Sequence, residues 1–238
     1  MKDLGPAKNV LGISIKRDEE TGQIRLSQER YIKETIERFG MQEAKSVSTP
    51  IESNTKITTE ICPQTPKEIY EMKHKPYRKL IGALIHLANA TRPDIAFAAA
   101  TLSRFCVNPG KMHWIFAKRV LCYLKATSKY CITYIRNNEK LKANSDSDGA
   151  GDVDDRKSCT GNLLVLSGGP ISWKSVKQSS VALSTMEAEY AALAEVLREV
   201  IYVKRLLNHI DFKEQISDPI DVYCDNQSAI ELSKNAVP

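Results

Sequence analysis

Three carboxylates within residues 141–238 are of the type and placement that a divalent-cation site would use. Asp146 closes a predicted strand, Glu189 lies in the first turns of a predicted helix, and Asp225 directly follows another strand. Two-metal hydrolysis of phosphodiesters needs several carboxylates converging on Mg²⁺ ions about 4 Å apart. Carboxylate oxygens are hard ligands suited to Mg²⁺, and strand ends and helix starts hold them rigidly. On spacing alone, however, three dispersed acids are more typical of surface charges.

Neighbouring acidic residues compete for the same interpretation. Ser184 and Glu187 match a capping box, which gives Glu187 a structural role and leaves Glu189 as the better ligand candidate. Asp148 is open to two interpretations, because it could join the site or stabilise the turn. A solvated acidic loop is expected for Asp152, Asp154 and Asp155.

The elements that would position these acids form an ordered series. Residues 141–146, 161–167, 171–175 and 220–224 are predicted strands, residues 184–208 form one long helix before the last of them, and another helix starts after Asp225. The order β, β, β, α, β indicates a mixed sheet with helices packed on it. The fold class expected for the whole chain is therefore α+β or α/β.

Residues 1–140 have a different character. Apolar runs at 10–15 and 23–26 flank a turn in which Gly22 supplies a positive φ, which predicts a hairpin. A helix capped by Ser27 and ended by Gly40 follows, then an irregular loop over residues 46–66. Helices are predicted at residues 77–89, 93–105 and 113–125.

The charge differs between the two parts of the chain. Residues 1–140 carry 24 Lys+Arg against 14 Asp+Glu, a net +10, whereas residues 141–238 carry 10 against 15, a net −5. A basic part suits a phosphate backbone and an acidic part suits divalent cations. Lys118, Arg119 and Lys125 on the predicted helix 113–125 are candidate nucleic-acid contacts, although an ordinary solvated helix face is the preferred explanation.

Composition excludes several other classes. The six cysteines have no paired short spacing and the four histidines do not cluster near them, so we expect reduced thiols and neither a zinc site nor a disulfide framework. No apolar run approaches a membrane span and the start lacks the pattern of a signal peptide. An intracellular protein without a membrane partner is expected.

Several ordered motifs carry a specific resemblance. They are NSDSDGAGD (144–152), DDRKS (154–158), GPISWKS (169–175), STMEAEY (184–190) and YCDNQSA (223–229). Taken in order, they resemble the ribonuclease H region of copia-type retrotransposon Pol polyproteins. The motifs MKDLG (1–5), LGI (11–13), LSQ (26–28), STP (48–50), ATRPDI (90–95) and LSRF (102–105) are similar to the end of the same family's polymerase palm and its thumb and connection.

The resemblance implies two domains and a specific chemistry. Residues 1–140 would be the end of the reverse transcriptase palm with thumb and connection, and residues 141–238 a ribonuclease H-like domain that is incomplete at its C-terminus. Asp146, Glu189 and Asp225 would be catalytic and hold Mg²⁺ in a two-metal site. The implied reaction is endonucleolytic cleavage of RNA in an RNA–DNA hybrid, where the 2′-hydroxyl identifies the RNA strand. Lys174 and Lys177 are candidate hybrid contacts; for Trp173 strand packing is preferred.

The same resemblance leaves a second function open. The polymerase active-site motif lies upstream of Met1 in the family, the family's last strand, final helix and fourth acid lie beyond Pro238, and Gly149 stands where tryptophan is usual. The alternative is a non-catalytic remnant that binds a template–primer duplex, or one with no retained role. Expected partners are the hybrid or template–primer duplex and the upstream polymerase portion, in the cytoplasm, a virus-like particle or the nucleus.

Overall fold

The computed structural model describes residues 5–53, 55–137, 139–212, 216 and 219–234. It divides into two compact units, Met1–Asp18 with Ile24–Ile132 and Glu19–Gln23 with Thr133–Pro238. The described residues form seven α-helices and two sheets, a mixed α/β content compatible with the expected α+β class. The start of the MKDLG motif, residues 1–4, lies outside the described residues. No helix in the described ranges is long and apolar enough to cross a membrane.

The first unit contains both strands of the predicted hairpin, β2 (Ile13–Arg17) and β3 (Ile24–Ser27), in antiparallel register. Gly22 has φ 68° in the turn, as predicted. The strand predicted over residues 10–15 is interrupted, because Leu11 and Gly12 both have positive φ and turn the chain between β1 (Asn9–Val10) and β2. Positive φ is incompatible with a continuous strand, so the apolar run is two strands.

Helix α1 (Glu29–Arg38) starts one residue later than predicted. Its N-cap position is Gln28, while Ser27 remains in β3 and its Oγ accepts a hydrogen bond from the Glu29 amide at 3.2 Å. The helix buries Ile32 and Ile36 at one-turn spacing, and the chain leaves it at Gly40 with φ 64°. The predicted helix and its C-terminal glycine are confirmed, and the helix has one apolar face.

The remaining helices of the first unit are α2 (Pro66–Lys73), α3 (Tyr77–Ala90), α4 (Ala96–Ser103) and α5 (Lys111–Ala126), with 3-10 turns η1 (Thr59–Ile61) and η2 (Pro93–Ile95). Helix α2 was not predicted, although Thr65 and Glu68 form a complete capping box with proline at the first turn. The core of this unit includes Leu80, Leu84, Leu87, Leu102, Val120, Leu121 and Leu124.

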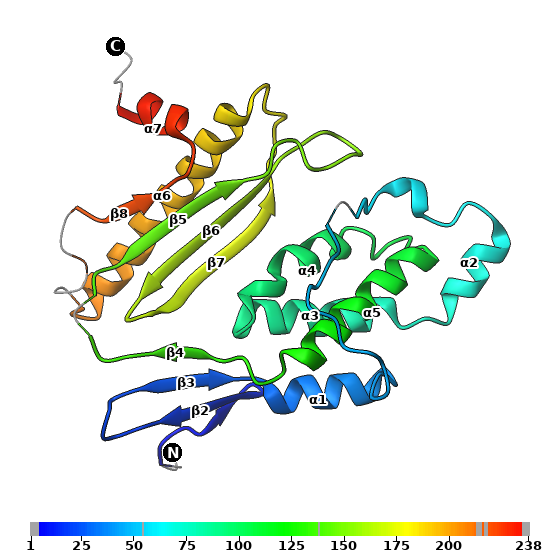
Figure 1. Ribbon diagram of the computed structural model, residues 1–238, viewed down its shortest axis with the longest axis horizontal. Coiled ribbons are helices and arrows are strands. Elements are labelled where there is room, and N and C mark those ends of the chain that lie inside the picture. Colours follow the sequence, from blue (N-terminus) through cyan, green and yellow to red (C-terminus); the bar gives the residue numbers. More distant parts are fainter. Residues whose placement is uncertain (1–4, 54, 138, 213–215, 217–218, 235–238) are drawn as a thin grey trace. The chain divides into compact units, whose positions relative to one another are not determined.

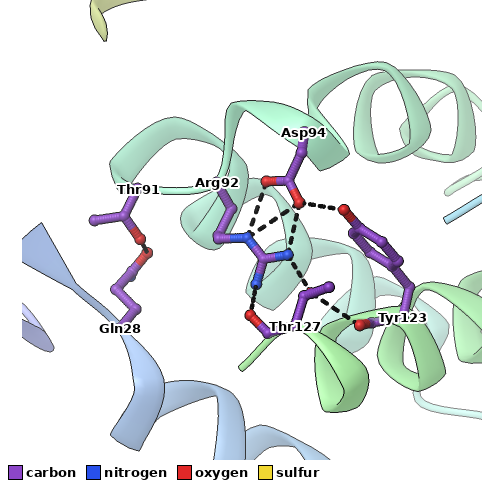
Figure 2. Close-up of polar contacts among 6 residues, drawn as sticks. All are labelled: Gln28, Thr91, Arg92, Asp94, Tyr123 and Thr127. Carbon is purple, nitrogen blue, oxygen red and sulfur yellow. Dashed lines mark hydrogen bonds and ion pairs between the residues drawn. The ribbon is translucent and has the colours of Figure 1, made fainter. Parts of the chain in front are cut away.

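A buried arginine links the 3-10 turn η2 to the end of α5 (Figure 2). The Arg92 side chain is 1% exposed, forms an ion pair with Asp94 at 2.6 Å and donates to the Thr127 carbonyl and hydroxyl at the end of α5. The Tyr123 hydroxyl donates to the same Asp94 carboxylate at 2.8 Å. Because a buried charge is tolerated only when it is paired and hydrogen-bonded, the ATRPDI motif has a structural role in this unit.

The second unit is a four-stranded sheet in the order β7-β6-β5-β8, with helix α6 lying along one face (Figure 1). Its strands are β5 (Lys142–Ser147), β6 (Cys159–Leu166), β7 (Gly169–Lys177) and β8 (Asp221–Tyr223); the chain enters this unit through β4 (Ile132–Tyr134), which was not predicted. The helices are α6 (Thr185–His209) and α7 (Gln227–Lys234). Strands β5, β6 and β7 are antiparallel, whereas β8 joins β5 in parallel, so the predicted mixed sheet is confirmed.

The core of the second unit lies between α6 and the sheet. Val196, Val200, Val203 and Leu207 recur at helical spacing on α6 and pack with Ala143, Leu164 and Leu166 of the strands. This packing fixes the position of the helix against β5 and β6, and with it every side chain on the first turns of α6.

Candidate active site

The parallel pairing of β5 and β8 brings two of the predicted acids to one sheet edge. Asn144 lies opposite Tyr223 in the register. Two residues further along, β5 carries Asp146, and the chain that leaves β8 after Tyr223 carries Asp225. Because parallel strands end on the same side, both carboxylates are carried at the edge where the first turns of α6 place Glu189. Asp146 and Asp225 are exposed, whereas Glu189 is buried.

Glu189 is the buried centre of this cluster. Its residue surface is 5% exposed, and its Oε1 atom accepts a hydrogen bond from the Ser147 amide at 3.1 Å. Burial raises the pKa of the Glu189 carboxyl, and the negative charges of Asp146 and Asp225 raise it further, partly offset by hydrogen bonds from Ser147 and Cys224. A buried carboxylate with two acidic neighbours is a local concentration of negative charge that a cation would relieve.

The donor atoms suit a hard divalent cation. Atoms of Glu189, Cys224 and Asp225 that could bind a metal all lie within 4.8 Å of one another. The Cys224 thiol is 3.9 Å from Glu189 Oε2, toward which it donates, and burial together with the charges of Glu189 and Asp225 raises its pKa. Mg²⁺ is a hard ion that prefers oxygen over sulfur ligands, so the carboxylate oxygens of Glu189 and Asp225 are the donors that suit it. Asp146 falls outside that three-residue group but raises the pKa of Glu189 through its charge.

The neighbouring acids have structural partners. Asp148 accepts a hydrogen bond from the Cys159 amide at 2.6 Å, so its carboxylate stabilises the turn after β5. Glu187 accepts from the Leu183 amide at 2.7 Å, while the Ser184 hydroxyl accepts from the Glu187 amide at 3.1 Å. Glu187 therefore reaches back to the helix start as predicted, although its carboxylate binds the amide of Leu183 instead of that of the N-cap residue Ser184.

The acidic loop after β5 is not uniformly solvated, which corrects the expectation for Asp152. Its side chain is only 6% exposed and forms an ion pair with Lys177 at 2.6 Å. The same ammonium lies 2.8 Å from Asp155, whose pKa it lowers. Lys177, a predicted hybrid contact, thus pairs with two carboxylates of this loop and supplies the counter-charge that the buried Asp152 side chain needs.

The other predicted nucleic-acid contacts are distributed over both units. Within the first unit, Lys118 lies over the Trp114 ring at 5.9 Å, Arg119 pairs with Glu52 at 2.7 Å, and Lys125 donates to backbone carbonyls, including that of Ala44 at 2.9 Å. Arg119 and Lys125 therefore hold loop segments against α5, whereas Lys118 contacts a residue of its own helix.

In the second unit, Lys174 is exposed on β7 opposite Asn162, and the adjacent Trp173 is half-buried opposite Leu163. Of the five basic candidates, Lys174 is exposed, whereas the other four are half-buried: Lys118, Arg119, Lys125 and Lys177.

Two further residues adjoin the carboxylates and were missed from the sequence. Ser147 contacts Glu189 through its amide, and the Gln178 amide group contacts the Ser147 hydroxyl at 3.3 Å. Both are polar residues at strand ends, and nothing in their type or spacing distinguishes them from ordinary turn residues. Their role depends on contacts across 31 residues or more of sequence.

The fold and the carboxylate cluster define a mixed-sheet domain with a candidate divalent-cation site, preceded by a helical unit. The chain is 46% identical over its whole length to the retrovirus-related Pol polyprotein from transposon TNT 1-94 of Nicotiana tabacum, and 38% identical over 95% of its length to that from transposon RE2 of Arabidopsis thaliana. It belongs to the family of Pol polyproteins of copia-type transposons, as the motifs predicted.

The matched region is a small part of those relatives. The chain spans 18% of the tobacco polyprotein and 15% of the Arabidopsis polyprotein. The chain is also 45% identical to the secreted RxLR effector protein 161 of Plasmopara viticola. That match covers 56% of this chain and 94% of the effector protein. No family model and no solved structure matches the chain.

Proposed function

We propose that this Pol-derived chain carries a ribonuclease H-type activity, the Mg²⁺-dependent endonucleolytic cleavage of RNA in an RNA–DNA hybrid. The observation that carries the proposal is the buried Glu189 carboxylate, flanked by Asp146 and Asp225, whose charges raise its pKa. A cluster that disfavours its own ionisation is a common property of sites that bind a cation or move a proton. The ordered motifs around these three acids support the same assignment.

Each residue has a distinct task in this proposal. Glu189, Asp146 and Asp225 would hold Mg²⁺, which when bound activates water and stabilises the leaving oxygen of the phosphodiester. The Ser147 amide fixes one oxygen of Glu189, so that the carboxylate has a defined orientation before a ligand arrives. Exposure of Asp146 and Asp225 leaves the outer side of the cluster open to a phosphate backbone.

The proposed substrate class rests on the sequence motifs around the three acids, which resemble the ribonuclease H region of copia-type Pol polyproteins. The relatives' names, retrovirus-related Pol polyproteins, are consistent with this proposal. An RNA–DNA hybrid is distinguished from duplex DNA by its shape and by the 2′-hydroxyls of one strand. We therefore expect cleavage of the RNA strand of a hybrid and none of duplex DNA.

The test is cleavage of a labelled RNA–DNA hybrid by the purified chain, with Mg²⁺ and with EDTA. Wild-type chain should cut the hybrid only with Mg²⁺, and Asp146→Asn should abolish cutting. The matched control is Asp154→Asn, which changes an exposed acid in the loop after β5 and should cut as wild type does. Cutting by Asp146→Asn indicates a contaminant, and a hybrid that is bound but left intact supports the non-catalytic template–primer binding function instead.

A further inference from the structure

The Gln178 side chain joins three elements behind the carboxylate cluster. Gln178 directly follows β7, and its Nε2 atom lies 2.9 Å from the Ala188 carbonyl of α6, 3.0 Å from the Thr160 hydroxyl of β6 and 3.3 Å from the Ser147 hydroxyl of β5. Its backbone amide donates to the Ser158 carbonyl at 2.8 Å. One side chain therefore links the strand that carries Asp146 to the helix that carries Glu189.

The chemistry of the partners determines which way the Gln178 amide group points. The Ala188 carbonyl can only accept a hydrogen bond, so the NH₂ end of the side chain must face α6. The Gln178 Oε1 atom is buried and has no hydrogen-bond partner among the described residues. Leaving a buried acceptor unpaired is unfavourable, so the NH₂ contacts with Ala188 and Thr160 hold this orientation.

These contacts lie next to the acids in the sequence. Ala188 precedes Glu189, Ser147 follows Asp146, and Thr160 is the register partner of Ser147 on β6. Ser147 is contacted twice, by Gln178 at its hydroxyl and by Glu189 at its amide. Partners of ligand residues fix ligand orientation, and changing them commonly weakens metal affinity.

We infer that Gln178 is a positioning residue that sets the distance between Glu189 and the end of β5. It touches none of the three carboxylates itself and acts through Ala188 and Ser147. The structural part of the inference stands on these contacts alone, and its consequence for metal binding rests on the proposed function.

The first test measures positioning without metal or substrate. The Ser147 amide donates to Glu189, so its hydrogen exchange reports that contact. Gln178→Met keeps the side-chain length but removes the NH₂ group, and should accelerate exchange at Ser147 at least tenfold more than at α7 amides. The control Gln64→Met changes an exposed glutamine in the first unit and should alter neither. Unchanged exchange at Ser147 in Gln178→Met overturns the inference.

A second variant tests the same contact if Gln178→Met does not fold. Thr160→Val removes one of the Gln178 acceptors with little change of shape, and should accelerate Ser147 exchange in the same direction by a smaller factor. If Gln178→Met does not fold, this variant decides, and wild-type exchange in Thr160→Val overturns the inference.

The third test measures the affinity of the cation site for Mn²⁺ by calorimetry. Cleavage kinetics on the hybrid are measured alongside it. Gln178→Met should weaken Mn²⁺ binding by about 10–100-fold and raise the Mg²⁺ concentration needed for cleavage, with the KM for hybrid unchanged. Equal Mn²⁺ affinity in variant and wild type overturns the role at the site. A wild-type chain that neither binds Mn²⁺ nor cuts hybrid contradicts the proposed function instead, and the exchange result is independent of it.

Discussion

Replacing Glu189 with glutamine should make the metal-free protein more stable at neutral pH. The Glu189 carboxylate is buried beside Asp146 and Asp225, which raise its pKa, so its ionisation opposes folding. Glutamine keeps an oxygen that can accept the hydrogen bond from the Ser147 amide but carries no charge. The substitution therefore removes a repulsion and retains the main contact.

The size of the effect follows from the geometry of the cluster. Metal-binding atoms of Glu189 and Asp225 lie within 4.8 Å of each other. Two unit charges at that distance repel by about 1 kcal/mol at the dielectric constant of water and by about 3.5 kcal/mol at an effective value near 20. Because Asp225 is exposed, the lower part of this range applies, and a gain of about 1–2 kcal/mol is expected. For a domain about the size of the second unit, the thermal midpoint changes by about 4–8 °C per kcal/mol.

The pH dependence has a definite sign. The folded state raises the pKa of Glu189 above its unfolded value, so the folded protein binds the extra proton in the pH range between the two values. The unfavourable contribution of Glu189 is fully present above the raised pKa and is relieved as the pH falls through it. The advantage of Glu189→Gln over wild type should therefore be largest near pH 7.5 and vanish in acid.

Thermal unfolding in EDTA with and without added Mg²⁺ measures this prediction. Glu189→Gln should unfold at a higher temperature than wild type in EDTA, and Mg²⁺ should stabilise wild type more than the variant. The control Glu195→Gln removes a 42% exposed partner of Arg198 on the same helix, and should lower stability by at most about 1 kcal/mol. A Glu189→Gln variant less stable than wild type in EDTA at pH 7.5 refutes the reasoning.

Three other outcomes are expected. Arg92→Ala should lower the free energy of unfolding by about 3–5 kcal/mol in denaturant titrations, because it leaves a buried network incomplete. Arg30→Ala, which changes a side chain that is 91% exposed, should alter that free energy by less than about 0.5 kcal/mol. Similar values for the two variants contradict the assigned burial. Lys177→Met should raise the pKa of Asp155 towards its ordinary value in an NMR titration, and an unchanged pKa excludes the ion pair. Hybrid affinity should fall with salt concentration, and salt-independent binding contradicts phosphate contacts.

Local sequence patterns predicted most of the fold where periodicity and caps are strong. The long helix capped by Ser184 and the apolar face of α1 follow from spacing alone. The Ser, Thr and Pro content of residues 46–66 correctly indicated an irregular loop, which the structure has up to Thr65 apart from the 3-10 turn η1, but the capping box of Thr65 and Glu68 that starts α2 was overlooked. The three-residue strand β4 was missed although Ile132, Thr133 and Tyr134 all favour strands, whereas the equally short β8 was predicted.

The environment of the candidate site is less predictable, because it depends on pairing between distant segments. Sequence placed Glu189 near a helix start, but its burial and the approach of Cys224 require β8 to join β5 in parallel. Basic residues were equally ambiguous. Lys125 and Lys177 have the charge expected of phosphate contacts, yet each binds a distant part of the chain. These partners are determined by tertiary packing, which local sequence does not reveal.

The most direct measurement of the proposed function is a cleavage assay on a hybrid whose RNA and DNA strands carry different labels. With Mg²⁺, wild-type chain should fragment the RNA strand and leave the DNA strand whole, and Asp146→Asn and Glu189→Gln should leave both whole while remaining folded. An RNA strand left intact by wild-type chain, under conditions in which a control ribonuclease H cuts it, contradicts the account.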